Sequence, residues 1–309
     1  MTSKSIIVIG STNMDMVVRT PRLPAPGETI LGDSFIMNPG GKGANQAVAI
    51  ARLGGEVTFV SKIGNDIFGA QSRELFKMEN INSDFLMKDD DNPSGVALIT
   101  VDEKGENIIV VAPGSNSNLN PEDVRSVFER IAKPDFLVTQ LEIPLETVRY
   151  ALEYAHSNGI RTILNPAPAN LEISDIFGLV DYITPNKSEA ELLSGVKIID
   201  LKSVELAART LQKKGPKNII ITLGEEGAAF LENDHFEIIP GVKVEARDST
   251  AAGDTFNGAL VVALSEDKNL AKAIEFACHA SAITVTRAGA QSSIPNREEL
   301  LIDILTSYI

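Results

Sequence analysis

The chain has 309 residues and a net charge of −14, with 43% apolar and 23% charged residues. This is the composition of an ordinary globular protein with a sizeable core, in one large α/β domain or two small domains. The acidic charge argues against a nucleic-acid partner, because phosphate backbones are bound by clustered Lys and Arg. It does not argue against a small anionic ligand, which a few local donors and a metal can hold.

The cysteine content and the hydropathy limit the disulfides, the metal sites and the cellular location that can be expected. The single cysteine, Cys278, excludes an intrachain disulfide and argues against a cysteine-based zinc site. Met1–Ser5 leads directly into the apolar Ile6–Ile9, without the long apolar region and cleavage site of a signal peptide. No apolar run approaches the ~18 residues that cross a bilayer. We therefore expect a cytoplasmic protein without a membrane partner.

Short apolar β-type runs alternate with helical patterns along the chain. The expected strands are Ile6–Ile9, Val57–Ile63, Phe136–Gln140, Thr162–Asn165, Tyr182–Pro185 and Asn218–Thr222. The expected helices are Ala44–Leu53, Leu145–Ser157, Lys187–Ser194 and Val204–Lys214. Apolar strands without polar alternation, separated by helices, predict an α/β fold with a mainly parallel central sheet and helices on both faces. We expect one such domain over residues 1–309, with ligands at the carboxyl ends of its strands.

Two segments depart from this alternation. Residues 12–38 are rich in Pro and Gly and contain extended stretches, and residues 95–112 hold two β runs around the polar turn Asp102–Asn107. Two β runs around such a turn predict a hairpin. We expect these segments to form a small β-sheet lid apart from the main sheet; the alternative is that they extend the main sheet.

The segment Asp248–Leu260 carries the first candidate chemistry. Ala251, Ala252 and Gly253 permit a tight turn before a helical stretch, which predicts free backbone N–H groups that bind an anion at a helix N-terminus. Asp254 lies at the mouth of this pocket, where a carboxylate can orient and deprotonate an attacking hydroxyl. Asp is also a favoured helix cap. The sequence allows both roles at once, with Asp254 as cap and as base.

The segment Pro39–Ala47 places three glycines around Lys42 before a helix that begins near Ala44. The glycines allow a ligand to approach the backbone closely. The spacing is not that of a Walker A loop, and no G-x-G-x-x-G motif follows the first strand. The alternative is a helix-capping turn with Lys42 on the surface.

Further polar residues follow the expected strands. Asn13 and Asp15 have side chains of the kind that bind sugar hydroxyls, although Asn-x-Asp is also common in turns. Glu142 and Asn186 follow two other strands; Glu142 is otherwise a surface residue and Asn186 a helix cap. The glycines of Thr222–Gly227 permit a tight turn against a flat ligand or a phosphate, or form an ordinary surface turn.

Together and in this order, these segments resemble the ribokinase (PfkB-type) family of carbohydrate kinases over nearly the whole chain. The two most specific motifs, Gly40–Asn45 and Asp248–Gly258, are intact. Gly10–Asp15 and Asn165–Ala169 are also similar to the family pattern. The resemblance implies ATP-dependent phosphorylation of D-ribose at its 5-hydroxyl, which gives D-ribose 5-phosphate and ADP.

The resemblance also implies roles for individual residues. Asp254 is the catalytic base, and Gly253 donates its backbone N–H to the transferring phosphate. The sugar is held by Asn13, Met14, Asp15, Gly41, Lys42, Gly43, Ala44, Asn45, Glu142 and Asp254. ATP is bound by Asn186, Thr222, Leu223, Gly224, Glu225, Glu226, Gly227, Gly253 and Cys278. Cys278 departs from the Asn or His that is common near the adenine, which puts that contact in doubt.

The resemblance further implies that Mg²⁺ arrives with ATP and that a monovalent cation, K⁺, is held by Asp248, Thr250, Thr284, Arg287, Gly289 and Ser293. The resemblance implies a homodimer that pairs two lids. The nearest alternatives are a kinase for deoxyribose, a nucleoside or another sugar. A non-catalytic sugar-binding sensor is the alternative from another class, and the intact Asp254 argues against it.

Overall fold

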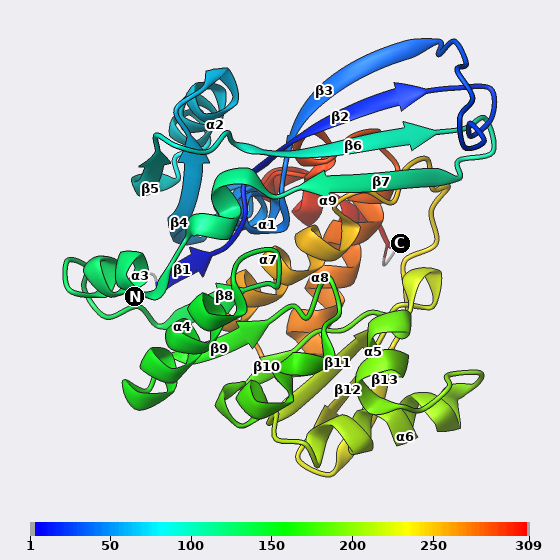
Figure 1. Ribbon diagram of the computed structural model, residues 1–309. Coiled ribbons are helices and arrows are strands. Elements are labelled where there is room, and N and C mark those ends of the chain that lie inside the picture. Colours follow the sequence, from blue (N-terminus) through cyan, green and yellow to red (C-terminus); the bar gives the residue numbers. More distant parts are fainter. Residues whose placement is uncertain (1–3, 308–309) are drawn as a thin grey trace.

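The computed structural model describes residues 4–307, which form two separate β-sheets (Figure 1). The main sheet contains, in spatial order, β13 (His235–Ile239), β12 (Ala228–Glu232), β11 (Asn218–Thr222), β10 (Tyr182–Ile183), β9 (Arg161–Leu164), β8 (Phe136–Thr139), β1 (Ser5–Ile9), β4 (Glu56–Gly64) and β5 (Asn82–Asp89). Its strands are parallel except for the antiparallel pairs that β12 makes with β11 and β13. The predicted α/β fold with a mainly parallel central sheet is confirmed.

Helices cover both faces of the main sheet. One face carries α1 (Lys42–Arg52), α2 (Ile67–Met78), α7 (Ala252–Ser265), α8 (Leu270–Val285) and α9 (Arg297–Ser307). The other carries α3 (Pro121–Phe128), α4 (Leu145–Ser157), η2 (Leu171–Leu179), α5 (Lys187–Ser194) and α6 (Leu201–Gln212). In β1, Ile6 and Val8 join the first core and Ile7 and Ile9 the second, which explains why its sequence lacks polar alternation. None of the helices within residues 4–307 has the length and hydropathy of a membrane span.

The helix and strand boundaries follow the sequence patterns closely. Leu145–Ser157 and Asn218–Thr222 occur with the expected limits. The strand expected at Tyr182–Pro185 ends at Ile183, two residues before a proline that has no N–H to give to a sheet. The polar residues that follow this shortened strand therefore lie beyond its end, at the edge of the sheet.

The second, small sheet has the order β3 (Ser34–Gly40), β2 (Asn13–Arg19), β6 (Gly95–Val101) and β7 (Asn107–Ala112). It projects beyond the main sheet (Figure 1). The predicted hairpin is present, because β6 and β7 pair antiparallel. The two sheets are separate, so the alternative that these segments extend the main sheet is wrong. Strand β3 ends at Gly40 and thus leads directly into the glycine-rich loop before α1.

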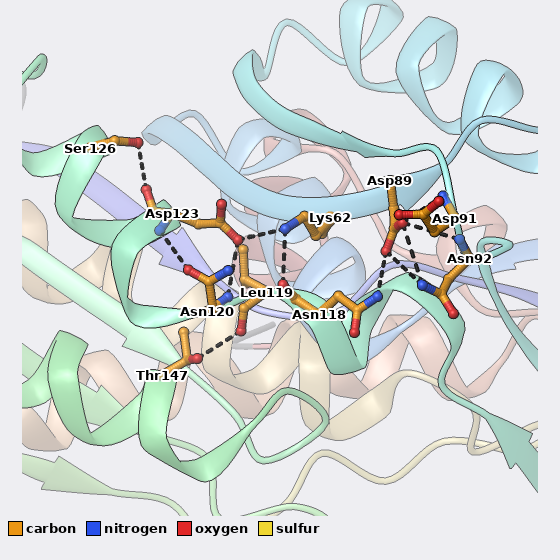
Figure 2. A network of polar contacts seen from close by, with 10 residues as sticks. All are labelled: Lys62, Asp89, Asp91, Asn92, Asn118, Leu119, Asn120, Asp123, Ser126 and Thr147. Carbon is orange, nitrogen blue, oxygen red and sulfur yellow. Dashed lines mark hydrogen bonds and ion pairs between the residues drawn. The ribbon is translucent and has the colours of Figure 1, made fainter.

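The segments that join the small sheet to the main body are held by a polar network around Lys62 (Figure 2). Lys62, on β4, donates to the Asn118 carbonyl at 2.9 Å and to Asp123 Oδ2 at 2.7 Å. Asp89, at the end of β5, accepts hydrogen bonds from Asn118 Nδ2 at 2.6 Å and from the Asn92 N–H at 3.0 Å. The network therefore ties both the entry to β6 and the exit from β7 to the main sheet.

Several parallel strands end at the same edge of the main sheet. These are β1, β8, β9, β10 and β11. The next strand of the main sheet along the chain, β4, lies on one side of β1 and the later strand β8 on the other side, so the strand order reverses beside β1. In open α/β sheets, ligands bind outside the carboxyl ends of the strands at such a switch point. Asn13, Glu142 and Asn186 all follow strands that end at this edge.

Candidate active site

The first feature of this edge is the N-terminus of α7. Ala251 precedes the helix with a left-handed φ of 61° and provides no side-chain cap. This conformation costs a non-glycine residue about 1–2 kcal/mol, and such strain is found preferentially at functional sites. Within residues 4–307, no group accepts a hydrogen bond from the N–H of Gly253 or Asp254. Two free donors therefore lie at the positive end of the helix dipole, where the sequence predicts an anion pocket.

Asp254 is the third residue of α7, and its side chain is bound by α1. Its Oδ2 accepts from Asn45 Nδ2 at 2.9 Å and its Oδ1 from Gln46 Nε2 at 3.0 Å. The expectation that Asp254 caps its own helix is wrong, because Ala251 occupies the N-cap position and another helix binds both carboxylate oxygens. At 6% exposure, the carboxylate is instead held beside the free N–H group of Gly253.

Glycines bring the backbone of the loop before α1 against the end of β1. Gly41 has a φ of 90°, in the left-handed region that favours glycine. A Cβ atom on Gly43 would lie 2.6 Å from the carbonyl carbon of Gly10, so only glycine fits there. Glu142, after β8, accepts a hydrogen bond from the Lys42 N–H at 3.0 Å. These contacts fix the start of α1, the end of β1 and the end of β8 together.

Carboxylates and one ammonium group gather around this loop. Burial, together with the negative charges of Glu142 and Asp254, raises the pKa of Asp15 to about 7. Burial acts to lower the pKa of Lys42, but the charges of Asp254, Glu142 and Glu189 raise it above its ordinary value. The cluster therefore offers both hydrogen-bond acceptors and a permanent donor to a ligand with several hydroxyl groups.

The raised pKa of Asp15 makes the folding stability depend on pH. The carboxyl has a pKa of about 7 in the folded protein against its ordinary value of 3.8, so the folded state binds the proton more tightly. The folded state is therefore penalised increasingly as pH rises from about 4 to about 7, and fully above that range. We predict that Asp15→Asn raises Tm by several degrees at pH 8 and hardly changes it at pH 4. Thermal scans of both proteins at the two pH values test this; a Tm difference that is the same at both contradicts it.

Asn13 and Met14 open strand β2, and a buried amide orients Asn13. The Oδ1 of Asn116, which follows β7, accepts from the Thr12 N–H at 2.9 Å, and its Nδ2 donates to Asn13 Oδ1 at 2.8 Å. Because a backbone N–H can only donate, the Asn116 amide has one orientation, and Asn13 Oδ1 must face it. The amide Nδ2 of Asn13 is left to donate to a ligand, while the Met14 side chain is buried.

Asn186 and the turn after β11 lie side by side. Thr222 forms an isolated parallel bridge with Asn186. The Leu223 N–H donates to the Gly227 carbonyl at 2.8 Å and closes the turn, in which η3 (Gly224–Glu226) is exposed. Asn186 Oδ1 accepts from the Glu189 N–H at 2.9 Å, so Asn186 caps α5, as the alternative interpretation expected. Its Nδ2 group finds no acceptor in the described part of the chain, which leaves one donor beside the turn.

Asp248 joins two loops that are distant in sequence. Its Oδ2 accepts from the Gly289 N–H at 2.9 Å and its Oδ1 from the Thr250 N–H at 2.9 Å. Burial acts to raise the pKa of Asp248, but these hydrogen bonds lower it below its ordinary value. The buried Thr284 hydroxyl donates to Thr255 Oγ1 on α7 at 3.0 Å. The Asp248 N–H donates to the carbonyl of Val285, beside Thr284 on α8, at 3.2 Å, so the loop with the ionised Asp248 is connected through α8 to the helix that carries the free N–H groups.

The side chains of the remaining predicted cation residues are engaged elsewhere. The Arg287 guanidinium donates to Glu299 at 2.9 Å, and the Ser293 hydroxyl donates to the Ala290 carbonyl at 2.7 Å. A guanidinium is positively charged and has no acceptor atom, so Arg287 can offer a cation only its backbone carbonyl, whereas the Ser293 oxygen keeps a lone pair for a cation.

Cys278 lies on α8, within the apolar core between α7, α8 and the main sheet. Burial, with the nearby charge of Glu275, raises the pKa of its thiol to about 12. The neutral thiol therefore behaves as a small apolar side chain. Within residues 4–307, no hydrogen bond connects it to the turn at Thr222–Gly227, and its place in a nucleotide site stays a prediction.

Several buried amide side chains line this edge to which the sequence patterns assigned no role. They are Gln46, Asn116, Gln140, Asn165 and Asn257. Gln140 and Asn165 directly follow β8 and β9, and a polar side chain at the carboxyl end of a buried strand is a signal that the sequence does contain. Gln46 and Asn257 lie among apolar residues on buried helix faces, where an amide must find partners.

Comparisons with known proteins agree with this architecture. The model of the pfkB family carbohydrate kinases matches residues 3–297. The chain is 45% identical to the ribokinase of Haemophilus influenzae, over 96% of this chain and 97% of that protein. Its structure is similar to that of the ribokinase of Thermotoga maritima, with a TM-score of 0.88, 40% identity and coverage of 98% and 99% of the two chains. It is also similar to the Arabidopsis thaliana ribokinase complexed with ribose and ATP, with a TM-score of 0.89, 26% identity and coverage of 98% and 99%.

Proposed function

Because the chain belongs to the pfkB family of carbohydrate kinases, we propose that it transfers the γ-phosphoryl group of ATP to the 5-hydroxyl of D-ribose. The products are D-ribose 5-phosphate and ADP. The observation that carries this proposal is the position of the buried carboxylate of Asp254, next to two free N–H groups and to the polar cluster around Lys42. The similarity to the ribokinases supports ribose as the sugar. We expect the reaction in the cytoplasm, where ATP is available.

The sugar lies, in this proposal, between the small sheet and the start of α1. Asp15 and Glu142 accept hydrogen bonds from its hydroxyl groups, and Asn13 Nδ2 and the Lys42 ammonium donate. Asn45 Oδ1 is buried and has no partner among the described residues, which suits a sugar hydroxyl as donor. The remaining proposed contacts come from Met14, Gly41, Gly43 and Ala44. Of these, Gly41 and Gly43 keep the backbone close to the sugar.

The chemical step is an in-line displacement at the γ-phosphorus. The 5-hydroxyl oxygen forms a bond to phosphorus, the bond to the β-phosphate oxygen breaks, and ADP leaves with that electron pair. Asp254 takes the proton of the hydroxyl. The N–H of Gly253 stabilises the charge on the transferring phosphoryl oxygens. Positioning and charge stabilisation suffice, without a covalent enzyme intermediate.

ATP is bound, in this proposal, at the carboxyl ends of β10 and β11. Asn186 Nδ2 forms one side of the site together with the turn made up of Thr222, Leu223, Gly224, Glu225, Glu226 and Gly227. Cys278 contributes an apolar surface near the adenine. Bound with ATP, Mg²⁺ would neutralise phosphate charge, and phosphate oxygens and water would largely hold it.

We also propose a monovalent cation, K⁺, at the loop of Asp248. The ionised carboxylate and the oxygens of Thr250, Thr284, Arg287, Gly289 and Ser293 are hard oxygen donors of the kind that such a cation accepts. The Asp248 N–H donates to the Val285 carbonyl at the end of α8, and the neighbouring Thr284 is hydrogen-bonded to Thr255 on α7, so a cation there would hold the anion pocket in shape.

Cation dependence is the prediction that follows. We expect turnover to be markedly slower in tetramethylammonium than in potassium at equal ionic strength, because the large ion cannot be enclosed by these oxygens. Asp248→Asn should lose most of this difference, since it removes the charge that attracts the cation. The measurement is initial velocity with either salt; equal rates in the unaltered protein contradict the cation site.

We propose that the small sheet acts as a lid and pairs with the lid of a second copy. Its strands expose several large apolar side chains: Phe35, Ile36, Met37, Leu98, Ile108, Ile109, Val110 and Val111. Exposed apolar patches of this kind mark protein interfaces. Closure of the lid over the sugar would exclude water and limit ATP hydrolysis. Sedimentation analysis of the chain and of Val110→Lys tests the dimer, which the lysine should weaken.

The choice of sugar is the least constrained element, because one added or missing hydroxyl alters few contacts. Deoxyribose, a nucleoside or another sugar is the main alternative. The deciding experiment measures ADP release with ribose, deoxyribose, fructose and adenosine. We expect the highest kcat/KM for ribose. A higher kcat/KM for another member of the panel would assign that compound as the substrate instead of ribose. Ligand binding without ADP release would indicate a sugar-binding sensor instead of a kinase.

A further inference from the structure

Gln46 is a fully buried residue of α1 that binds directly to the proposed base. Its Nε2 donates to Asp254 Oδ1 at 3.0 Å and to Asn165 Oδ1 at 3.1 Å. Its Oε1 accepts from Gln140 Nε2 at 2.7 Å. The Gln46 amide thus makes three hydrogen bonds to protein groups: each of its two N–H groups has its own acceptor, and its oxygen has one donor.

The polarity of this network is fixed by its two ends. An ionised Asp254 can only accept, so the Nε2 group of Gln46 must face it. At the other end, Asn165 Nδ2 donates to the Thr184 carbonyl, which can also only accept, so Asn165 Oδ1 must face Gln46. Gln46 Oε1 is then turned towards Gln140. Each amide therefore has one satisfactory orientation, and the network cannot flip without placing two donors or two acceptors face to face.

The same network continues to the peptide next to the base. The Thr184 hydroxyl donates to Asn257 Oδ1 at 2.6 Å, and Asn257 Nδ2 donates to the Gly253 carbonyl at 2.8 Å. Buried hydrogen bonds thus connect the ends of β8, β9 and β10 to both groups that flank the transferring phosphate in the proposed reaction. Gln46 is the only member of this chain of amides that contacts the Asp254 carboxylate.

We propose that Gln46 is a positioning residue, which fixes the plane of the Asp254 carboxylate for proton transfer. Asn45 holds one carboxylate oxygen and Gln46 the other, so the group cannot rotate about its Cβ–Cγ bond. Burying an amide is costly unless its hydrogen bonds are made, and an apolar side chain at this position would suit packing alone. This inference rests on the proposed phosphoryl transfer and on Asp254 as its base.

The test compares two substitutions of nearly equal shape at Gln46. Gln46→Met keeps the length but removes the donor, and kcat should fall about 10–100-fold, since a small misplacement of a catalytic group has effects of this size. The KM values for sugar and ATP should stay within about twofold. Gln46→Glu keeps the shape but turns a second acceptor towards Asp254, and it should lose more activity than Gln46→Met. If Gln46 only fills space, Glu is the better replacement, and that order overturns the proposal.

Gln140→Met is the matched control, because it removes a fully buried amide one hydrogen bond further from Asp254. We expect a clearly smaller fall in kcat than with Gln46→Met. Equal losses in both variants, with parallel rises in KM, indicate a structural role and overturn the proposal. The assay uses whichever sugar of the panel is turned over, so a wrong substrate does not count against Gln46. A crystal structure of Gln46→Met tests the claim without turnover: an Asp254 carboxylate in its original plane contradicts it.

Discussion

Replacing Asp254 with Asn is expected to lower kcat about 10³-fold, which is within the range that a positioned proton acceptor contributes. An amide cannot take the proton of the 5-hydroxyl. The structure adds a second reason, because Asn45 and Gln46 each present a donor to one carboxylate oxygen. An asparagine has one oxygen only, so its own NH₂ group would face one of these donors.

The controls for Asp254→Asn are binding measurements. The affinity for ATP should change little, because the proposed nucleotide site around Asn186 and Thr222–Gly227 does not use Asp254. A change in kcat with an intact ATP affinity locates the defect in the chemical step. Steady-state kinetics and calorimetry provide both values. A near-normal kcat would remove Asp254 as the base and leave it with the binding of sugar alone.

Gly43→Ala is expected to abolish efficient turnover by a different route. In an ordinary helix this change is favourable, because alanine is the better helix former by about 1 kcal/mol. Here the added Cβ would lie 2.6 Å from the backbone N of Ser11 and 2.6 Å from the carbonyl carbon of Gly10. Neither atom belongs to a flexible side chain, so α1 must move away from β1. We expect a destabilisation of about 1–3 kcal/mol from overpacking and a KM for sugar raised about 100-fold by the shifted loop.

Gly178→Ala is the matched control for this substitution. Gly178 lies in η2 without a left-handed φ, and outside the neighbouring backbone no atom lies within 4 Å of a Cβ placed there. Its Tm and KM should equal those of the unaltered protein. The measurements are thermal unfolding and sugar dependence of the initial rate. If Gly43→Ala retains the original KM, then the close approach of α1 to β1 is not required for sugar binding.

Strand β1 and the hairpin of β6 and β7 show why much of the fold could be predicted from the sequence. The apolar run Ile6–Ile9 lacks polar alternation because both faces of β1 are buried. Runs of this kind therefore predict a parallel sheet with helices on both faces. The polar turn Asp102–Asn107 between two β runs predicted the hairpin of β6 and β7. Local rules suffice for these elements, since burial on two faces and turn chemistry both act over a few neighbouring residues.

The site motifs were visible for a similar reason. The glycines around Lys42 are required because the backbone is left-handed at Gly41 and approaches the end of β1 closely at Gly43, and a requirement for glycine is visible in the sequence. The same local reasoning failed for the helix cap. Asp254 suits an N-cap by residue type, but α7 begins at Ala252 and the carboxylate is bound from α1.

By itself, the sequence determined the alternation of strands and helices, the separate β segments and the glycine loops, because these follow from short-range sterics and from burial patterns along one element. Only the tertiary structure decided the partners of Asp254 and Asn13. Asn45 and Gln46 reach Asp254 from more than 200 positions away in the chain, and Asn116, which follows β7, reaches Asn13 from 103 positions away. A hydrogen bond depends on distance in space, and that distance is fixed only when α1, α7 and both sheets pack together.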